Sequence, residues 1–522
     1  MTINACLRRA RRLHARSIAI HYGERKSTYP EFYQQVEESA RKLTGMGVAP
    51  GDRVAVLMLN SPEYLDLYYS TAFAHAMIVP LNTRWHVNDV IFTLKDSESK
   101  ILFVDEKHAS LVAQIRAGVP SIEHVVFAGE GAVPEGAVRW TEVESSGALP
   151  EGEPDENDVS GLYYTSGTTG GPKGAMLTHR NLFTQAIHSI VPPLTMSNDW
   201  RFLHVAPMFH LADAGAINAL TLSGATHCFV PSFDAEETLR AIERYRIDSV
   251  VLVPTMINMV VNHPNFGRYD LSSLKRVLYG ASPMPLPLLR QAVDQLRCEF
   301  VQGYGMTEVS AIATLLTPAD HSFEGSDREF APVKSGGRAA LYMEVRVVDH
   351  NDRDVPAGEV GEIILRGPNV MKGYWKRPEI TAEVLRGGWM HTGDLGVLDE
   401  DGFLYVRDRK KDMIKTGSEN VYSPEVESMI CGHPGILEAA VIGVPDPRWG
   451  ETIRAVVVTR VGATLTQEEL IGWCRERMTH FKCPTSVVFA ETLPKGGTGK
   501  VQKNVLRERF GGELGRAAEE RR

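Results

Sequence analysis

The sequence has few cysteines, no long apolar run and no excess of positive charge. Its six cysteines are scattered and form no C-x-x-C pair, which argues against a zinc site or a disulfide framework and favours a reducing cytoplasm. No apolar stretch reaches the length that spans a bilayer, and the start lacks a signal-peptide core, so we expect no integral membrane segment. A net charge of -9 argues against a general affinity for nucleic acid.

The N-terminal residues carry five arginines between positions 8 and 16, interleaved with leucine and alanine. Such a pattern is compatible with a basic helix on a lipid surface. We favour an ordinary surface helix with solvated arginines.

At 522 residues the chain is too long for a single core. From Ser17 onward, apolar strand patterns alternate with helical patterns, which is typical of βα units on parallel sheets. We expect an α/β fold in which a large N-terminal domain, residues 1–407, contains two doubly wound layers of sheet. We place a domain boundary at the charged run 408–412, and residues 413–522 predict a small C-terminal α+β domain.

A loop rich in glycine and hydroxyl side chains occupies residues 164–174, with the sequence YTSGTTGGPKG. Glycines let the backbone approach a polyanion, hydroxyls donate hydrogen bonds, and a lysine supplies positive charge. The common G-x-x-x-x-G-K-[ST] loop is excluded, because Lys173 stands between Pro172 and Gly174. We therefore expect a different cradle for a nucleoside triphosphate, formed by Thr165, Ser166, Gly167, Thr168, Thr169, Gly170 and Lys173.

A second motif, GYGMTE at residues 303–308, follows a predicted strand that ends at Gln302. Magnesium prefers hard oxygen ligands, so a carboxylate just beyond a strand, near a phosphate loop, is a candidate ligand. That residue is Glu308. It stands where a dinucleotide fingerprint needs its third glycine, which disfavours a nicotinamide cofactor.

These motifs, with WMHTGDL at 389–395 and LPKGGTGK at 493–500, resemble the adenylate-forming superfamily of acyl-CoA synthetases, adenylation domains and firefly luciferases. The similarity runs in order from about Ser17 to Arg507. It implies ATP, Mg2+ and CoA as cofactors and a small carboxylic acid as substrate. It also implies that the N-terminal domain binds ATP and the acyl group while the C-terminal domain moves. Related ligases are often dimers, so a homodimer is one expected assembly.

The resemblance assigns roles to individual residues. It places Tyr304 beside adenine, Thr307 on a phosphate, and Asp394 with Arg409 on the ribose. Lys411 would be the pivot of the hinge, and Gly417 would give a thiol access to the site. The catalytic residues would be Lys500, the adenylating lysine, with Thr165, Glu308 and His210. Further nucleotide- or acyl-site positions would be Val253, Gly280, Ala281, Ser282, Gln302, Gly303 and Gly305.

His210 lies in the PMFH sequence at 207–210, which matches an aromatic gate beside the acyl site. A carboxylate there would hold an amino-acid ammonium, and a histidine cannot do so in the same way. Small residues follow it, and they favour an apolar tunnel. We therefore predict an AMP-forming acyl-CoA synthetase acting on medium- or long-chain fatty acids.

Several alternatives stay open. One is a ligase for aryl acids such as cinnamates, and another is an enzyme that loads a carrier protein or oxidises the adenylate as luciferases do. The remote alternative is a catalytically silent nucleotide-binding protein. The presence of Glu308, Asp394 and Lys500 together argues against it.

Overall fold

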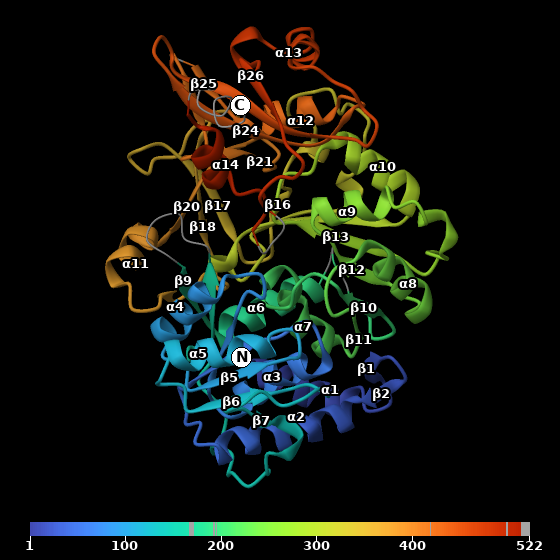
Figure 1. Cartoon of the computed structure of the whole chain (residues 1–522), viewed down its shortest axis with the longest axis vertical. Coiled ribbons are helices and arrows are strands. Elements are labelled where there is room, and N and C mark those ends of the chain that lie inside the picture. The colour runs from blue at the N-terminus through green and yellow to red at the C-terminus, as the bar shows by residue number, and fades with distance from the viewer. Residues whose placement is uncertain (166–171, 192–193, 195, 418, 497–499, 513–522) are drawn as a thin grey trace.

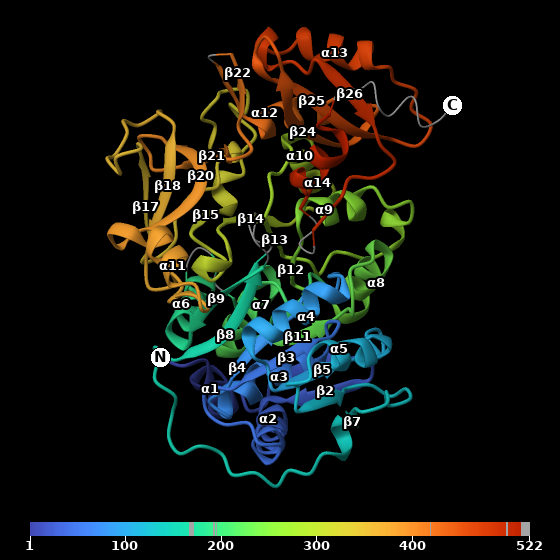
Figure 2. The same ribbon diagram turned by 60° about the vertical axis from the view of Figure 1, so that its left-hand side comes forward.

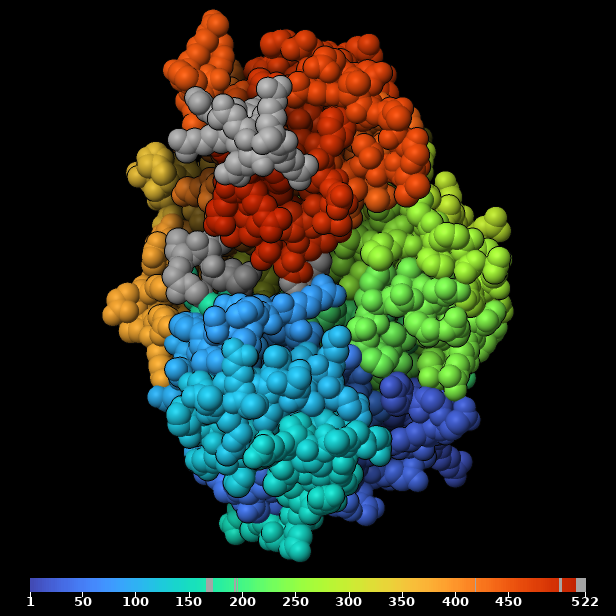
Figure 3. Space-filling view, viewed as in Figure 1, coloured from blue at the N-terminus to red at the C-terminus, as the bar shows by residue number. Residues whose placement is uncertain are grey.

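The fold is seen in a computed structural model of the chain, which describes residues 1–165, 172–191, 194, 196–417, 419–496 and 500–512. Three sheets form the large N-terminal part, and the C-terminal part lies at one end of it, as Figures 1 and 2 show. The space-filling view in Figure 3 shows the C-terminal part resting directly on the N-terminal part. The predicted α/β class is confirmed.

The first sheet has eight strands and carries the base of the phosphate loop. Its inner strands are parallel, whereas β8, β9 and β19 pair in antiparallel fashion at one edge. In sheet order the strands are β19 (Gly373–Tyr374), β9 (Lys173–Thr178), β8 (Val159–Thr165), β4 (Met77–Pro80), β3 (Arg53–Leu57), β5 (Ile101–Val104), β6 (His124–Phe127) and β7 (Val138–Arg139). The helices along this stretch of chain are α3 (Pro62–Phe73), α4 (Val87–Ser97) and α5 (Val112–Gly118).

The second sheet has nine strands and carries the GYGMTE motif at the end of β14. In order these are β16 (Arg338–Ala339), β15 (Thr314–Leu316), β14 (Glu299–Tyr304), β13 (Arg276–Gly280), β12 (Ser249–Val251), β10 (Arg201–His204), β11 (Thr226–Phe229), β1 (Ile18–Tyr22) and β2 (Arg25–Thr28). The other helices among the strands of these first two sheets are α1 (Ile3–Leu13), α2 (Tyr29–Gly45), α6 (His179–Ile190), α7 (Leu211–Ser223), α8 (Ala235–Tyr245), α9 (Pro254–Val261) and α10 (Leu286–Leu296).

A third sheet corrects the expectation that two doubly wound layers account for the chain up to residue 407. It is antiparallel throughout and contains β17 (Glu344–Val348), β18 (Gly361–Arg366), β20 (Met390–Leu398) and β21 (Leu404–Arg409), with α11 (Pro378–Val384) between β18 and β20. Antiparallel neighbours need no crossover helix, so β18 follows β17 and β21 follows β20 with no helix between them.

The C-terminal part is a compact α+β unit, as the sequence predicted. Its sheet contains β23 (Glu419–Val421), β22 (Ile414–Thr416), β25 (Gly450–Thr459), β24 (Ile436–Asp446) and β26 (Ser486–Phe489). Its helices are α12 (Ser423–Cys431), α13 (Gln467–Arg475) and α14 (Lys503–Phe510).

Local sequence signals explain several element boundaries. Ser61 caps α3, because its hydroxyl accepts a hydrogen bond from the Tyr64 amide at 3.1 Å. Asp234 caps α8 in the same way, with 2.9 Å to the Glu237 amide. Helix α1 buries Ile3, Leu7, Ala10 and their neighbours in the N-terminal core, as a packed surface helix should. Within the described residues, no helix combines the length and apolar character that a membrane crossing requires.

Candidate active site

The two ends of the phosphate loop are held side by side. Strands β8 and β9 pair so that Thr165 lies opposite Lys173 and Tyr164 opposite Gly174. A side chain at Gly174 would approach the Tyr164 ring to 3.0 Å, so only glycine fits here without a shift. The predicted phosphate ligands Ser166, Gly167, Thr168, Thr169 and Gly170 lie outside the described residues.

Asp96 on α4 anchors this hairpin. Its carboxylate accepts a hydrogen bond from the Tyr164 hydroxyl at 2.7 Å and forms an ion pair with Arg377, also at 2.7 Å. Burial and the Asp96 carboxylate both raise the pKa of Tyr164. The base of the loop is therefore fixed by a helix and by a segment some 200 residues further along the chain.

The ends of β13 and β14 meet beside this region. Gly280 pairs with Gly303, and a side chain at Gly280 would collide with the Gly303 carbonyl oxygen. Gly305 is equally constrained by the Ala311 carbonyl. Ala281 has φ of +65°, a left-handed conformation that is rare for a residue with a side chain. Ser282 follows Ala281 in this turn, and Gln302 precedes Gly303 in β14, so these predicted nucleotide- or acyl-site positions lie together.

Asp394 is the centre of the predicted ribose site. It lies opposite Arg409 in the β20–β21 register, and the Arg409 Nε atom is 3.3 Å from one carboxylate oxygen. The other oxygen accepts a hydrogen bond from the Tyr304 hydroxyl at 2.9 Å. The structure thus brings together three predicted residues from segments that are far apart in the sequence.

Lys500 reaches the same group from the C-terminal part. Although much of this residue is exposed, burial of its ammonium is the largest cause that lowers its pKa to about 8. The positive charge of Arg409 lowers this pKa further, while the Asp394 and Asp412 carboxylates raise it. The Lys500 ammonium therefore lies within the electrostatic field of the Asp394–Arg409 pair.

Glu308 lies in a short 3-10 helix, Thr307–Val309, directly after β14. Its carboxylate is buried, and one oxygen accepts a hydrogen bond from the Tyr374 hydroxyl at 2.7 Å. The ammonium of Lys173 lies 5.6 Å from the centre of the same tyrosine ring. Tyr374 thus connects the candidate magnesium ligand with the lysine of the phosphate loop, and sequence analysis did not identify it.

The donor set around Glu308 suits a magnesium ion that accompanies a nucleotide. In the part of the chain that the structure describes, no lysine or arginine pairs with Glu308, and no three histidine, cysteine or acidic side chains cluster as metal ligands. One protein carboxylate is a sufficient anchor when phosphates and water supply the remaining oxygens.

His210 precedes the first residue of α7 and lies against the Phe209 ring, with 4.4 Å between ring centres. Burial, and then the nearby Arg84 charge, lower its pKa to about 3, so the imidazole is neutral at pH 7. Its buried Nε2 atom has no hydrogen-bond partner among the described residues. A neutral imidazole here can contact an uncharged part of a substrate.

The predicted hinge lies between contacts that belong to the two parts of the molecule. Arg409 still pairs with β20, whereas Asp412 forms a 2.8 Å ion pair with Arg507 on α14. Lys411 lies between them, and burial is the main cause that lowers its pKa. Gly417, with φ of +63°, contacts Trp449 within the C-terminal part: its amide donates to the Trp449 carbonyl at 2.7 Å.

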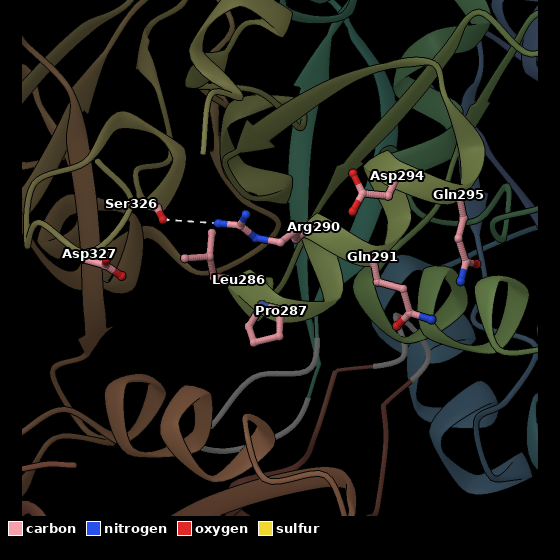
Figure 4. A pocket seen from close by; sticks show the side chains of 8 residues that line it. All are labelled: Leu286, Pro287, Arg290, Gln291, Asp294, Gln295, Ser326 and Asp327. Atoms are coloured by element: carbon pink, nitrogen blue, oxygen red, sulfur yellow. Dashed lines mark hydrogen bonds between the residues drawn. The ribbon is translucent and has the colours of Figure 1, made fainter. Parts of the chain in front are cut away.

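A surface cavity of about 550 Å³ beside α10 is separate from these residues (Figure 4). In it, Arg290 extends toward the Ser326 hydroxyl at 3.5 Å. None of the residues predicted for the site lines this cavity.

Comparison with known proteins gives a family for both parts of the chain. The family model for the AMP-binding enzyme matches residues 7–375, and that for the AMP-binding enzyme C-terminal domain matches residues 425–500. A feruloyl-CoA synthase of Amycolatopsis is 42% identical over 97% of this chain and 98% of its own. The long-chain-fatty-acid–CoA ligase FadD13 of Mycobacterium tuberculosis is 35% identical over 93% of each chain. The structure of ATP-bound MatB from Rhodopseudomonas palustris superposes with a TM-score of 0.86 at 31% identity, covering 98% of this chain and 99% of that one.

Proposed function

The chain belongs to the AMP-binding enzyme family, and we propose that it is an AMP-forming acyl-CoA synthetase. It would convert a carboxylic acid, ATP and CoA into acyl-CoA, AMP and pyrophosphate through an acyl adenylate. The observation that carries the proposal is the meeting of Tyr304, Asp394 and Arg409, which come from segments far apart in the sequence.

The first half-reaction overcomes the low reactivity of a carboxylate. Its negative charge repels nucleophiles, and oxide is a poor leaving group. In the proposed step a carboxylate oxygen attacks the α-phosphorus of ATP, the bond to pyrophosphate breaks, and AMP becomes the leaving group for the next step. The protonated Lys500 would stabilise the charge that develops between the carboxylate and the α-phosphate.

The nucleoside would be held by Asp394 and its neighbours. A carboxylate has about four lone-pair positions, so the hydrogen bond from Tyr304 and the ion pair with Arg409 leave it able to accept from a ribose diol. Thr165 and Lys173, together with the loop between them, would bind the phosphates. A magnesium ion held by Glu308 would neutralise phosphate charge.

In the second half-reaction, the C-terminal part would rotate about Lys411 and withdraw Lys500. The loop that contains Gly417 would then line the route by which the CoA thiol attacks the acyl carbon, with AMP leaving. Domain boundaries at 407 and 413 belong to this proposal, and a homodimer and a cytoplasmic location also remain predictions.

We propose an aromatic acid of the cinnamate type as the first substrate candidate. The feruloyl-CoA synthase is more similar to this chain than the fatty-acid ligase, at 42% against 35% identity. A neutral His210 beside Phe209 is compatible with an aromatic acyl group. A medium- or long-chain fatty acid is the second candidate, favoured by the small residues that follow His210.

The test is pyrophosphate release with a panel of acids, measured with and without CoA. The panel contains ferulate, benzoate and saturated fatty acids of increasing chain length. We expect acid-dependent pyrophosphate release and thioester formation, with ferulate turned over at the highest kcat/KM. Pyrophosphate release without a thioester would instead indicate transfer to a carrier protein, and no release with any acid would indicate a silent binding protein.

A further inference from the structure

We propose that Tyr374 is a positioning residue for the divalent cation that accompanies ATP. Its hydroxyl holds one oxygen of the Glu308 carboxylate and leaves the other for the cation. This inference rests on the proposed function, because it concerns how the adenylating site receives its metal–nucleotide complex.

The hydrogen bond between these residues lies in a protected place. Tyr374 is 8% exposed, Glu308 is 9% exposed, and the oxygen atoms are 2.7 Å apart. A hydrogen bond to an ionised carboxylate is roughly twice as strong as one between neutral groups. Within the described ranges, the Tyr374 hydroxyl is the only side-chain donor to Glu308, and no lysine or arginine forms an ion pair with this carboxylate.

The position of Tyr374 is fixed from two sides by the segment Met371–Arg377, here called the bridging segment. At its start, the Met371 amide donates to the Glu308 carbonyl at 2.8 Å. Beyond Tyr374, the Trp375 amide donates to the Gly174 carbonyl, also at 2.8 Å. The bridging segment is therefore bound to both motifs at once.

Further contacts restrict the Tyr374 backbone. Its amide donates to the Thr381 hydroxyl at 2.9 Å, and β19 pairs with β9 so that Tyr374 lies opposite Ala175. At the end of the bridging segment, Arg377 is paired with Asp96, which also anchors Tyr164. These contacts determine where the hydroxyl lies, and so they determine which way Glu308 is held.

The aromatic ring of Tyr374 has a second contact. The Lys173 ammonium lies 5.6 Å from the ring centre, within the range of a cation–π interaction. One side chain thus contacts the candidate cation ligand through its hydroxyl and the phosphate-loop lysine through its ring. Tyr374→Phe removes only the first contact, and Tyr374→Leu removes both.

A merely structural role would also explain a buried tyrosine, so the experiment needs a matched control. Tyr405 on β21 provides it, because its single hydroxyl proton lies between two acceptors, the Phe330 carbonyl at 2.8 Å and the Asp399 carboxylate at 3.1 Å. Tyr405→Phe loses a comparable hydrogen bond without touching Glu308. Thermal unfolding of both variants should first establish that they remain folded.

The main measurement is binding of the Mn2+–ATP complex, followed by electron paramagnetic resonance without acid or CoA. We expect Tyr374→Phe to weaken this binding about tenfold and to raise the Mg2+ concentration for half-maximal pyrophosphate release by a similar factor. The KM for the acid should stay within about twofold of wild type. Tyr374→Leu should additionally weaken binding of metal-free ATP.

A Glu308→Gln background supplies a second test. There Tyr374→Phe should change Mn2+–ATP binding less than about twofold, because the charged acceptor is already gone. Equal Mn2+–ATP binding by Tyr374→Phe and Tyr405→Phe would overturn the inference, as would an undiminished effect in the Glu308→Gln background. Failure of the wild-type protein to form any acyl-CoA would instead contradict the proposed function, while the binding measurement would still decide the role of Tyr374.

Discussion

The protonation of Lys500 should control the pH dependence of adenylation. Burial lowers the pKa of this ammonium to about 8, so its charge is lost as the pH rises through that value. About nine tenths of the lysine is protonated at pH 7 and about one tenth at pH 9, which follows from a pKa of about 8. If only the ammonium form catalyses adenylation, kcat/KM should fall about tenfold per pH unit above pH 8.

The assay is single-turnover pyrophosphate release without CoA, which separates adenylation from thiol chemistry. Bound phosphates add negative charge near the lysine and should raise its pKa, so the fall in kcat should lie at higher pH than the fall in kcat/KM. Lys500→Ala should slow this half-reaction by about 10²–10³, the range for loss of one electrostatic donor. Thioester formation from a supplied acyl adenylate should be largely retained.

The control is Lys500→Arg, because a guanidinium keeps its charge throughout this pH range. Its absolute rate should be lower, since the two side chains differ in shape, but the decline between pH 7 and pH 9 should disappear. A wild-type kcat/KM that stays constant from pH 7 to 9, or an identical decline in Lys500→Arg, would refute the reasoning. Equal loss of both half-reactions in Lys500→Ala would contradict a role confined to adenylation.

Three further changes test other parts of the site and fold. Asp394→Asn weakens the contacts with Tyr304 and Arg409 and should raise the KM for ATP about tenfold, whereas an unchanged KM would remove Asp394 from the ribose site. Asp213→Ala breaks the fully buried pair with His204 and should lower the free energy of unfolding by about 3 kcal/mol in urea titrations; a loss below about 1 kcal/mol would argue against it. Gly417→Ala introduces a side chain at positive φ beside Trp449 and should slow thioester formation while pyrophosphate release persists, and equal slowing of both would contradict the assigned role.

Sequence analysis is most informative about features that depend on residues close together in the chain. Element boundaries are set by signals of the same short range, since the caps at Ser61 and Asp234 join residues three positions apart. The α/β class follows from alternating apolar patterns over short windows. The phosphate loop and the GYGMTE motif are each an unbroken run of residues, so each could be proposed as part of a nucleotide site from residue types alone, and their roles stay predictions.

The contacts that sequence analysis missed join residues that are distant in the chain. Tyr374 lies in a two-residue strand, too short to give a periodic signal, and it contacts Glu308 across 66 positions. The buried pair of His204 and Asp213 has no feature in the sequence that separates it from ordinary core residues. Such contacts depend on which strands become neighbours in a sheet, and sheet order is not encoded in any one segment.

The contacts around the proposed hinge bear on how one site could serve two reactions. Asp408, on the N-terminal side of Lys411, accepts hydrogen bonds from the amide and hydroxyl of Ser423 at 2.8 and 2.7 Å, across the proposed pivot. Asp412, on the other side, is tied to Arg507 and would move with the C-terminal part. Rotation about Lys411 would therefore break the Asp408–Ser423 contact together with the approach of Lys500 to Asp394. Each hydrogen bond to a charged group contributes about 1.5–3 kcal/mol, which is small enough for new contacts with CoA to offset.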